Sequence, residues 1–79
     1  MMNNACFEVG ETIVIGRNFD YRSYFIVDQF SDDLFYGLEI DDEYNPTYRA
    51  IMFKTIRNKD GTIDVRITWS GKIGNEKNN

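Results

Sequence analysis

The chain has 79 residues with 13 acidic and 9 basic side chains, which give a formal net charge of −4. This length supports one small domain, and the negative charge argues against unassisted binding to a nucleic-acid backbone. With no histidine and one cysteine, Cys6, the chain lacks a zinc ligand set, a nucleophile–histidine pair and an intrachain disulfide. We therefore expect a non-enzymatic protein with no catalytic residues, no metal site and no cofactor.

The composition also bears on where the protein works. No apolar run approaches the roughly 20 residues that a membrane helix needs, and the first residues lack the basic and apolar segments of a signal peptide. A core without crosslinks suits a reducing compartment. The sequence therefore predicts a cytoplasmic protein, of a microbe or of an infected host cell, with no membrane partner.

Three strands are predicted in the first half of the chain. The β-branched run Thr12–Gly16 indicates a buried strand, and Arg17–Arg22 has no periodicity and indicates a loop. Strands at Ser23–Phe30 and Leu34–Asp41 flank a turn at residues 31–33, which favour local hydrogen bonds. In the strand after this turn, alternation predicts the following inward-facing set: Leu34, Tyr36, Leu38 and Ile40.

The clearest signal is a β-hairpin from Tyr48 to Trp69, after a connection at residues 42–47. Asn58 favours the start of a type I turn, and Gly61 can take the left-handed conformation that follows it. This turn sets Asn58 opposite Thr62. The resulting register pairs Thr55 with Val65, Phe53 with Ile67 and Ile51 with Trp69, with these six on one face.

The same turn partly matches a calcium-binding EF-hand loop, at Asn58, Asp60 and Gly61. The first and twelfth positions of that loop need carboxylates, but they hold Ile56 and Ile67. We therefore expect a plain hairpin here.

About five short strands predict an all-β fold, a small antiparallel barrel over residues 1–70 with a flexible polar tail at 71–79. An SH3-like barrel closed over Trp69 is the first expectation, an OB-like barrel the second and a flat meander the third. One tryptophan, five tyrosines and six phenylalanines exceed what so small a core hides. Some aromatic rings should therefore lie at an interface.

The charges are unevenly distributed along the chain. Ten acidic and two basic residues precede Tyr44, whereas three acidic and seven basic residues follow Glu43. We expect an acidic surface that docks on a basic protein surface, as a small inhibitor or modulator of a nucleic-acid-handling protein would. Viruses and phages encode anti-defence inhibitors of this kind, which act as nucleic-acid mimics. The candidate residues of the acidic surface are Asp32, Asp33, Tyr36, Asp41, Asp42, Glu43 and Tyr44.

Two alternatives to the acidic inhibitor remain open, besides a solvated acidic face with no binding role. The first is a small-barrel adaptor that binds nucleic acid through the hairpin, with the candidate residues Arg49, Lys54, Arg57 and Arg66. The second is a structural subunit that forms homo-oligomers by pairing its edge strands.

Overall fold

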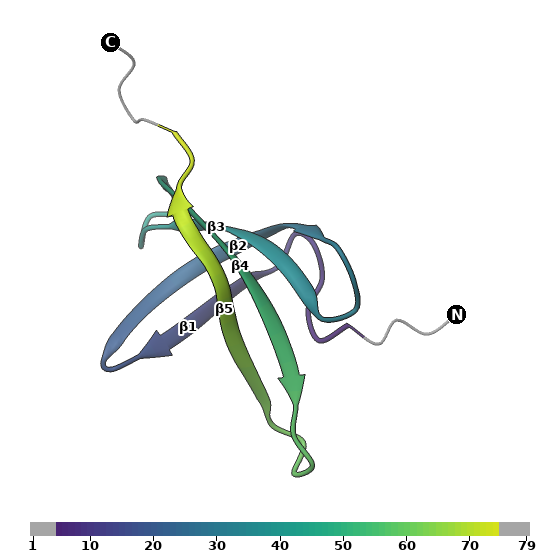
Figure 1. Cartoon of the computed structure of the whole chain (residues 1–79). Coiled ribbons are helices and arrows are strands. Elements are labelled where there is room, and N and C mark those ends of the chain that lie inside the picture. The colour runs from purple at the N-terminus through teal and green to yellow at the C-terminus, as the bar shows by residue number, and fades with distance from the viewer. Residues whose placement is uncertain (1–4, 75–79) are drawn as a thin grey trace.

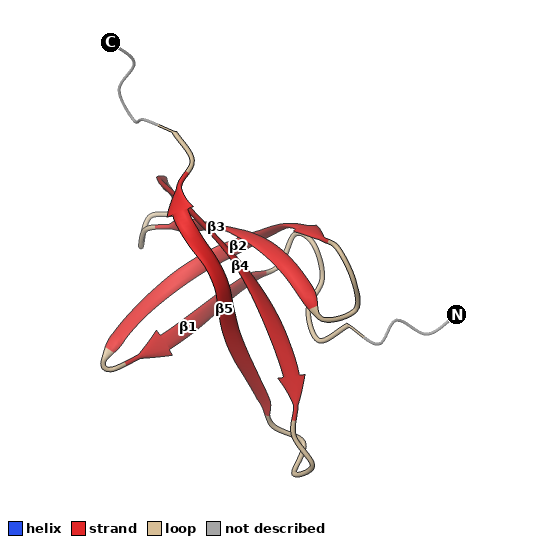
Figure 2. Cartoon of the chain, viewed as in Figure 1, coloured by secondary structure: helices blue, strands red, loops and turns tan. Residues whose placement is uncertain are grey.

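The computed structural model describes residues 5–74, and every regular element in this range is a β-strand (Figure 2). The strands are β1 (Thr12–Arg17), β2 (Asp20–Gln29), β3 (Leu34–Ile40), β4 (Pro46–Arg57) and β5 (Ile63–Lys72). They form one antiparallel sheet in the order β1-β2-β3-β4-β5. The sheet curls into a half-barrel, and the β4–β5 hairpin crosses the β1–β2 hairpin in Figure 1.

The expectation of a small all-β barrel is therefore confirmed at the level of its class, as a half-barrel. The consecutive strand order does not confirm an SH3-like arrangement specifically. The strand β5 continues through Lys72, two residues beyond the predicted end of the domain at residue 70. The rest of the predicted tail, residues 75–79, lies outside the described residues.

The segment 17–22, predicted as a loop, is a tight hairpin. Asn18 and Phe19 both have positive φ, 51° and 66°, between paired strands that close at Arg17 and Asp20. Two consecutive left-handed residues match the twist of the flanking strands in a two-residue turn. The prediction of a loop was wrong because Phe19 occupies the second turn position. Gly is the usual residue there, so the sequence did not indicate a two-residue hairpin turn.

The predicted turn of the β4–β5 hairpin is confirmed. The amide of Asn58 donates to the Thr62 carbonyl at 2.9 Å, and that of Gly61, at φ 91°, donates to the Asn58 carbonyl at 3.1 Å. The register of the five pairs that follow is also as expected, up to Phe53 and Ile67.

Beyond that pair the predicted register is wrong. A register shift between Met52 and Phe53 places Trp69 opposite Met52 and Ser70 opposite Ile51. The extra residue moves Trp69 to the outer face of the sheet. The indole is 45% exposed and lies on Gly71, where an added Cβ would be 2.8 Å from the ring. The barrel is thus not closed over this tryptophan.

The two faces of β3 are the reverse of the prediction. The concave side buries Phe35, Gly37 and Glu39. The outer face carries the set that was predicted to point inward, and its members are only partly buried: Leu34, Tyr36, Leu38 and Ile40. Three of the four residues on the outer face are aliphatic, so alternation alone predicts that this face is the buried one, which is wrong. Packing decides otherwise, because Phe35 stacks on Phe53 with ring centroids 5.4 Å apart.

The core fills the concave side of the half-barrel. Phe35, Phe53 and Ile26 are fully buried, and Phe7 meets both rings edge-on at 6.0 and 6.2 Å. The edge strand β1 contributes less to the core. Ile13, at 8% exposed, is its only buried residue, and Val14 on the outer face is 64% exposed. The prediction that β1 is buried is therefore wrong on its outer side.

Candidate functional site

Apolar side chains collect on the outer face of β2 and β3, where the sequence predicted none. Phe25 lies opposite Leu38 in the sheet register, so the two side chains share this face. With Ile40 they form the floor of a groove of about 370 Å³. Its full lining is Thr12, Phe25, Leu38, Ile40, Tyr44 and Pro46. An apolar groove on the exposed face of a sheet is a candidate binding surface.

One wall of the groove is the β3–β4 turn, which is held by Asp41. The Asp41 carboxylate accepts backbone N–H groups from Glu43 and Asn45, both at 2.9 Å. The Asp41 amide donates to the Asn45 carbonyl at 2.9 Å, and the Tyr44 amide donates to the Asp41 carbonyl at 3.0 Å. The turn is therefore rigid, and Asp41 is occupied in holding it.

Tyr44 occupies a backbone position that favours glycine. The β4–β5 turn repeats the same two hydrogen bonds, with Asn58 in the place of Asp41 and Gly61 in the place of Tyr44. Tyr44 has φ 65°, a left-handed conformation that costs a residue with a Cβ about 1–2 kcal/mol. Its ring is 74% exposed, so no burial offsets this cost. A strained, exposed aromatic beside a groove is a functional candidate.

The acidic candidates fall into two groups at opposite ends of β3. Asp42 and Glu43 are exposed in the turn beside the groove, with Tyr44. Asp32 and Asp33 lie in the turn that precedes β3. At about 3.3 Å per residue of strand, Asp33 and Asp41 are about 26 Å apart along the chain. Between them, Tyr36 is partly buried on the outer face, opposite Asp28 and Met52. The structure therefore brings Asp41, Asp42, Glu43 and Tyr44 together but not Asp32 and Asp33 with them.

Acidic and basic candidates meet at the other turn. Lys54 Nζ lies 3.9 Å from an Asp33 carboxylate oxygen, and the Ser31 hydroxyl also donates to this carboxylate at 2.8 Å. Arg57 lines a groove of about 480 Å³ together with both aspartates. Acidic and basic side chains are thus mixed at this end of the sheet.

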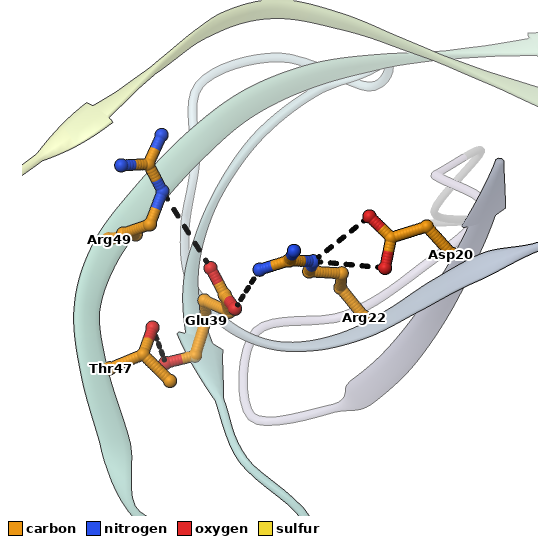
Figure 3. Close-up of polar contacts among 5 residues, drawn as sticks. All are labelled: Asp20, Arg22, Glu39, Thr47 and Arg49. Carbon is orange, nitrogen blue, oxygen red and sulfur yellow. Dashed lines mark hydrogen bonds and ion pairs between the residues drawn. The ribbon is translucent and has the colours of Figure 1, made fainter. Parts of the chain in front are cut away.

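The concave face holds an ion network around Glu39, which is 7% exposed (Figure 3). Arg22 Nη1 donates to Glu39 Oε2 at 3.0 Å, and Arg49 Nε lies 3.9 Å from Glu39 Oε1. Arg22 Nε also donates to both carboxylate oxygens of Asp20 at 3.3 Å. The hydrogen bond that Arg22 donates to Glu39, with the nearby charge of Asp20, raises the pKa of Arg22.

This network borders a polar cavity of about 430 Å³ that also includes Tyr24 and Ser70. Tyr24 is buried directly opposite Glu39. Burial, and then the charge of Glu39, raise the pKa of the Tyr24 phenol. Both oxygens of Glu39 face arginines, so the network ties β2, β3 and β4 together and offers no unoccupied carboxylate for chemistry.

The basic candidates therefore lie in different settings. Arg49 belongs to the concave ion network, and Arg57 lines the groove beside Asp32 and Asp33. Lys54 and Arg66 lie opposite each other on the outer face of the hairpin. The four do not form one continuous basic surface, which is what a strand of nucleic acid would contact.

Sequence reasoning missed Phe25, Leu38 and Ile40 as site residues. Leu38 and Ile40 were assigned to the core because aliphatic alternation favours the inward face. A local signal did exist in the high aromatic content, which exceeds the capacity of one small core. That signal indicates an interface but does not say which residues form it.

Comparisons with protein-family models, with curated proteins and with solved structures find no match for this chain. Among residues 5–74, no helix is long and apolar enough to cross a membrane. Function is therefore inferred from the side chains and their geometry alone.

Proposed function

We propose that this protein is a non-enzymatic binding protein that docks on another protein through the groove beside Tyr44. The docking surface comprises the groove residues together with Asp42 and Glu43 in the adjoining turn. It acts by covering a basic surface of its partner. The favoured role is that of an inhibitor or modulator of a nucleic-acid-handling protein.

The observation that carries this proposal is the strained conformation of Tyr44. A glycine would relieve the strain, as Gly61 does in the turn of the same form. Phe19 has a similar φ of 66° and is also exposed, but of these two rings only that of Tyr44 lines the apolar groove. A strained, exposed ring beside such a groove supports a contact with something outside the fold. Tyrosine is also the residue type that interfaces use most, since its ring buries area and its hydroxyl keeps a polar contact.

The charge next to this ring defines the chemistry of the partner. Asp42 and Glu43 are exposed in the turn that carries Tyr44, which lines the apolar groove. Acidic residues next to an apolar groove match an interface with an apolar centre and a polar border. Carboxylates at a rim orient an approaching basic surface and speed its association. Lysine- and arginine-rich surfaces are characteristic of proteins that bind nucleic acid, and this favours the inhibitory role.

The alternative of direct nucleic-acid binding has less support. Arg49 lies against Glu39, and Lys54 lies against Asp33, so part of the basic charge is already balanced within the chain. The net charge of −4 adds a general repulsion toward phosphates.

Charge reversal at each acidic turn, followed by affinity capture from a microbial lysate, tests the proposal. The double variant Asp42→Lys with Glu43→Lys should lose the proteins that the unmodified chain captures. Asp32→Lys, at the other end of β3, should keep them and is the matched control. Equal capture by all three proteins would place the contact elsewhere and reject the proposal.

A further inference from the structure

The gap between β1 and β5 is lined by strand edges and not by a sheet face. Successive residues of a strand point to opposite faces, so a cavity on one face is lined by alternate residues. Here a cavity of about 570 Å³ is lined by the consecutive residues 14–16 and 63–66, with Ile56. A second cavity, of about 310 Å³, is lined by residues 15–17 and 65–67. Both therefore lie in the open seam between β1 and β5.

This seam also exposes the core. The inward-facing Ile15 of β1 and Val65 and Ile67 of β5 pack against the core cluster but remain only partly buried. Their counterparts on the central strands, such as Phe35 and Phe53, are fully buried. Apolar side chains at the seam thus lack the cover that a neighbouring strand would provide.

The strand directions decide how the seam can close. Consecutive antiparallel strands alternate in direction, so β1, β3 and β5 run the same way. The two edges are thus parallel to each other and cannot complete the antiparallel pattern together. One additional strand, antiparallel to both edges, would give a closed barrel of six strands with uniform pairing.

The edge of β1 lacks most of the usual protection against such pairing, because its one charged residue, Arg17, stands at the end of the strand. Natural edge strands carry lysine, proline or inward charges that block added strands. The run Thr12–Ile15 is β-branched throughout, and Val14 is exposed beside the seam. Its backbone is therefore suited to accept a strand.

We propose that the seam between β1 and β5 binds an extended segment of a partner protein as a sixth strand. The segment spans about four or five residues, matching the lining runs 14–17 and 63–67. Its inward side chains are apolar, to fit between Ile15 and Val65. Its polar side chains are acidic, because both Arg17 and Arg66 line the seam and only Asp64 opposes them. This site is separate from the groove beside Tyr44.

The test uses a seven-residue peptide that alternates glutamate and valine, with blocked ends, added to the ¹⁵N-labelled protein. We expect slower amide exchange in residues 14–17 and 63–67, and antiparallel Hα–Hα contacts from the peptide to both β1 and β5. The control peptide has the same side chains with N-methylated valines, which cannot complete the backbone pairing. It should produce none of these changes.

A charge variant tests the predicted side-chain chemistry. Arg66→Glu should weaken binding of the glutamate–valine peptide by about two- to fivefold, the range of an exposed ion pair. Lys59→Glu, at the tip of the β4–β5 turn outside the seam, should leave its affinity unchanged and is the control for total charge.

Three results would overturn the proposal. The first is an unchanged spectrum at millimolar peptide. The second is contact with only one of the two edges. The third is a free protein that is dimeric by light scattering with the seam amides already protected, which would make a second copy of the chain the occupant.

Discussion

Arg22 and Glu39 face each other across β2 and β3, and their side chains meet at 3.0 Å on the concave side of the sheet. This contact explains why a carboxylate can occupy a buried position in β3. Glu39 reaches a second arginine, Arg49, on β4, so three strands share one ion network (Figure 3).

The first prediction concerns this network. Glu39→Leu should lower the urea midpoint of unfolding, because it leaves two arginines without their shared carboxylate. The double variant Arg22→Met with Glu39→Leu should recover part of the loss, since it removes a charge that no longer has a partner. Asp20→Ala, which affects only an exposed contact of Arg22, is the control and should change the midpoint little. Equal midpoints for all variants would mean that the network contributes nothing to stability.

The second prediction is a dependence of stability on alkaline pH. The pKa of Tyr24 is raised in the folded protein, so the fold favours the neutral phenol over the phenolate. This contribution is complete below the unfolded pKa of about 10, and it is lost as pH rises through the higher folded pKa. Urea unfolding of Tyr24→Phe should therefore show a smaller fall in stability above pH 10 than the unmodified protein. Identical slopes for the two proteins would contradict this assignment.

The third prediction concerns the stacked rings of the core. Phe35→Ala should cost about 3–5 kcal/mol, because it removes a fully buried ring that packs against both Phe7 and Phe53. A chain of this size has a total stability of roughly 4–12 kcal/mol, so the variant should be partly unfolded at room temperature. Phe19→Ala, which removes a ring that is 97% exposed, should leave stability nearly unchanged. Far-ultraviolet circular dichroism during thermal melting checks both.

The fourth prediction follows from the shared geometry of the β3–β4 and β4–β5 turns. Tyr44→Gly should stabilise the fold by up to about 1 kcal/mol, since it removes left-handed strain at the expense of some backbone entropy. Gly61→Ala should have the opposite effect, by about 1 kcal/mol, because it introduces the same strain where open space leaves no steric clash. Chemical denaturation measures both. A loss of stability in Tyr44→Gly would show that the ring supports the turn.

The parts of the fold that the sequence predicts are those that local chemistry decides. The turn from Asn58 to Gly61 forms because both residues suit their backbone positions, and it fixes the first pairs of the hairpin. The prediction fails after Phe53, where one extra residue shifts the register. A β-bulge leaves no clear mark in composition, so the outward position of Trp69 could not be predicted from it.

The candidate site was predictable only in its exposed half. Local composition places Tyr44 and the acids beside it in one turn, and the structure agrees on their proximity. The apolar half depends on which face of β3 is buried. The buried face of β3 is determined by two long-range contacts of its inward residues, Phe35 with Phe53 and Glu39 with Arg22. Neither contact is visible in the alternation of one strand.

The central claim is that Tyr44 is retained for contact with a protein partner, and one capture experiment tests it most directly. Tyr44→Gly and Phe19→Gly each remove an exposed ring from a left-handed turn position, so both variants should remain folded. Only Tyr44 lines the groove. We expect crosslinking and affinity capture to lose the bound protein with Tyr44→Gly and to retain it with Phe19→Gly. Retention by both variants, with circular dichroism showing both folded, would contradict the account.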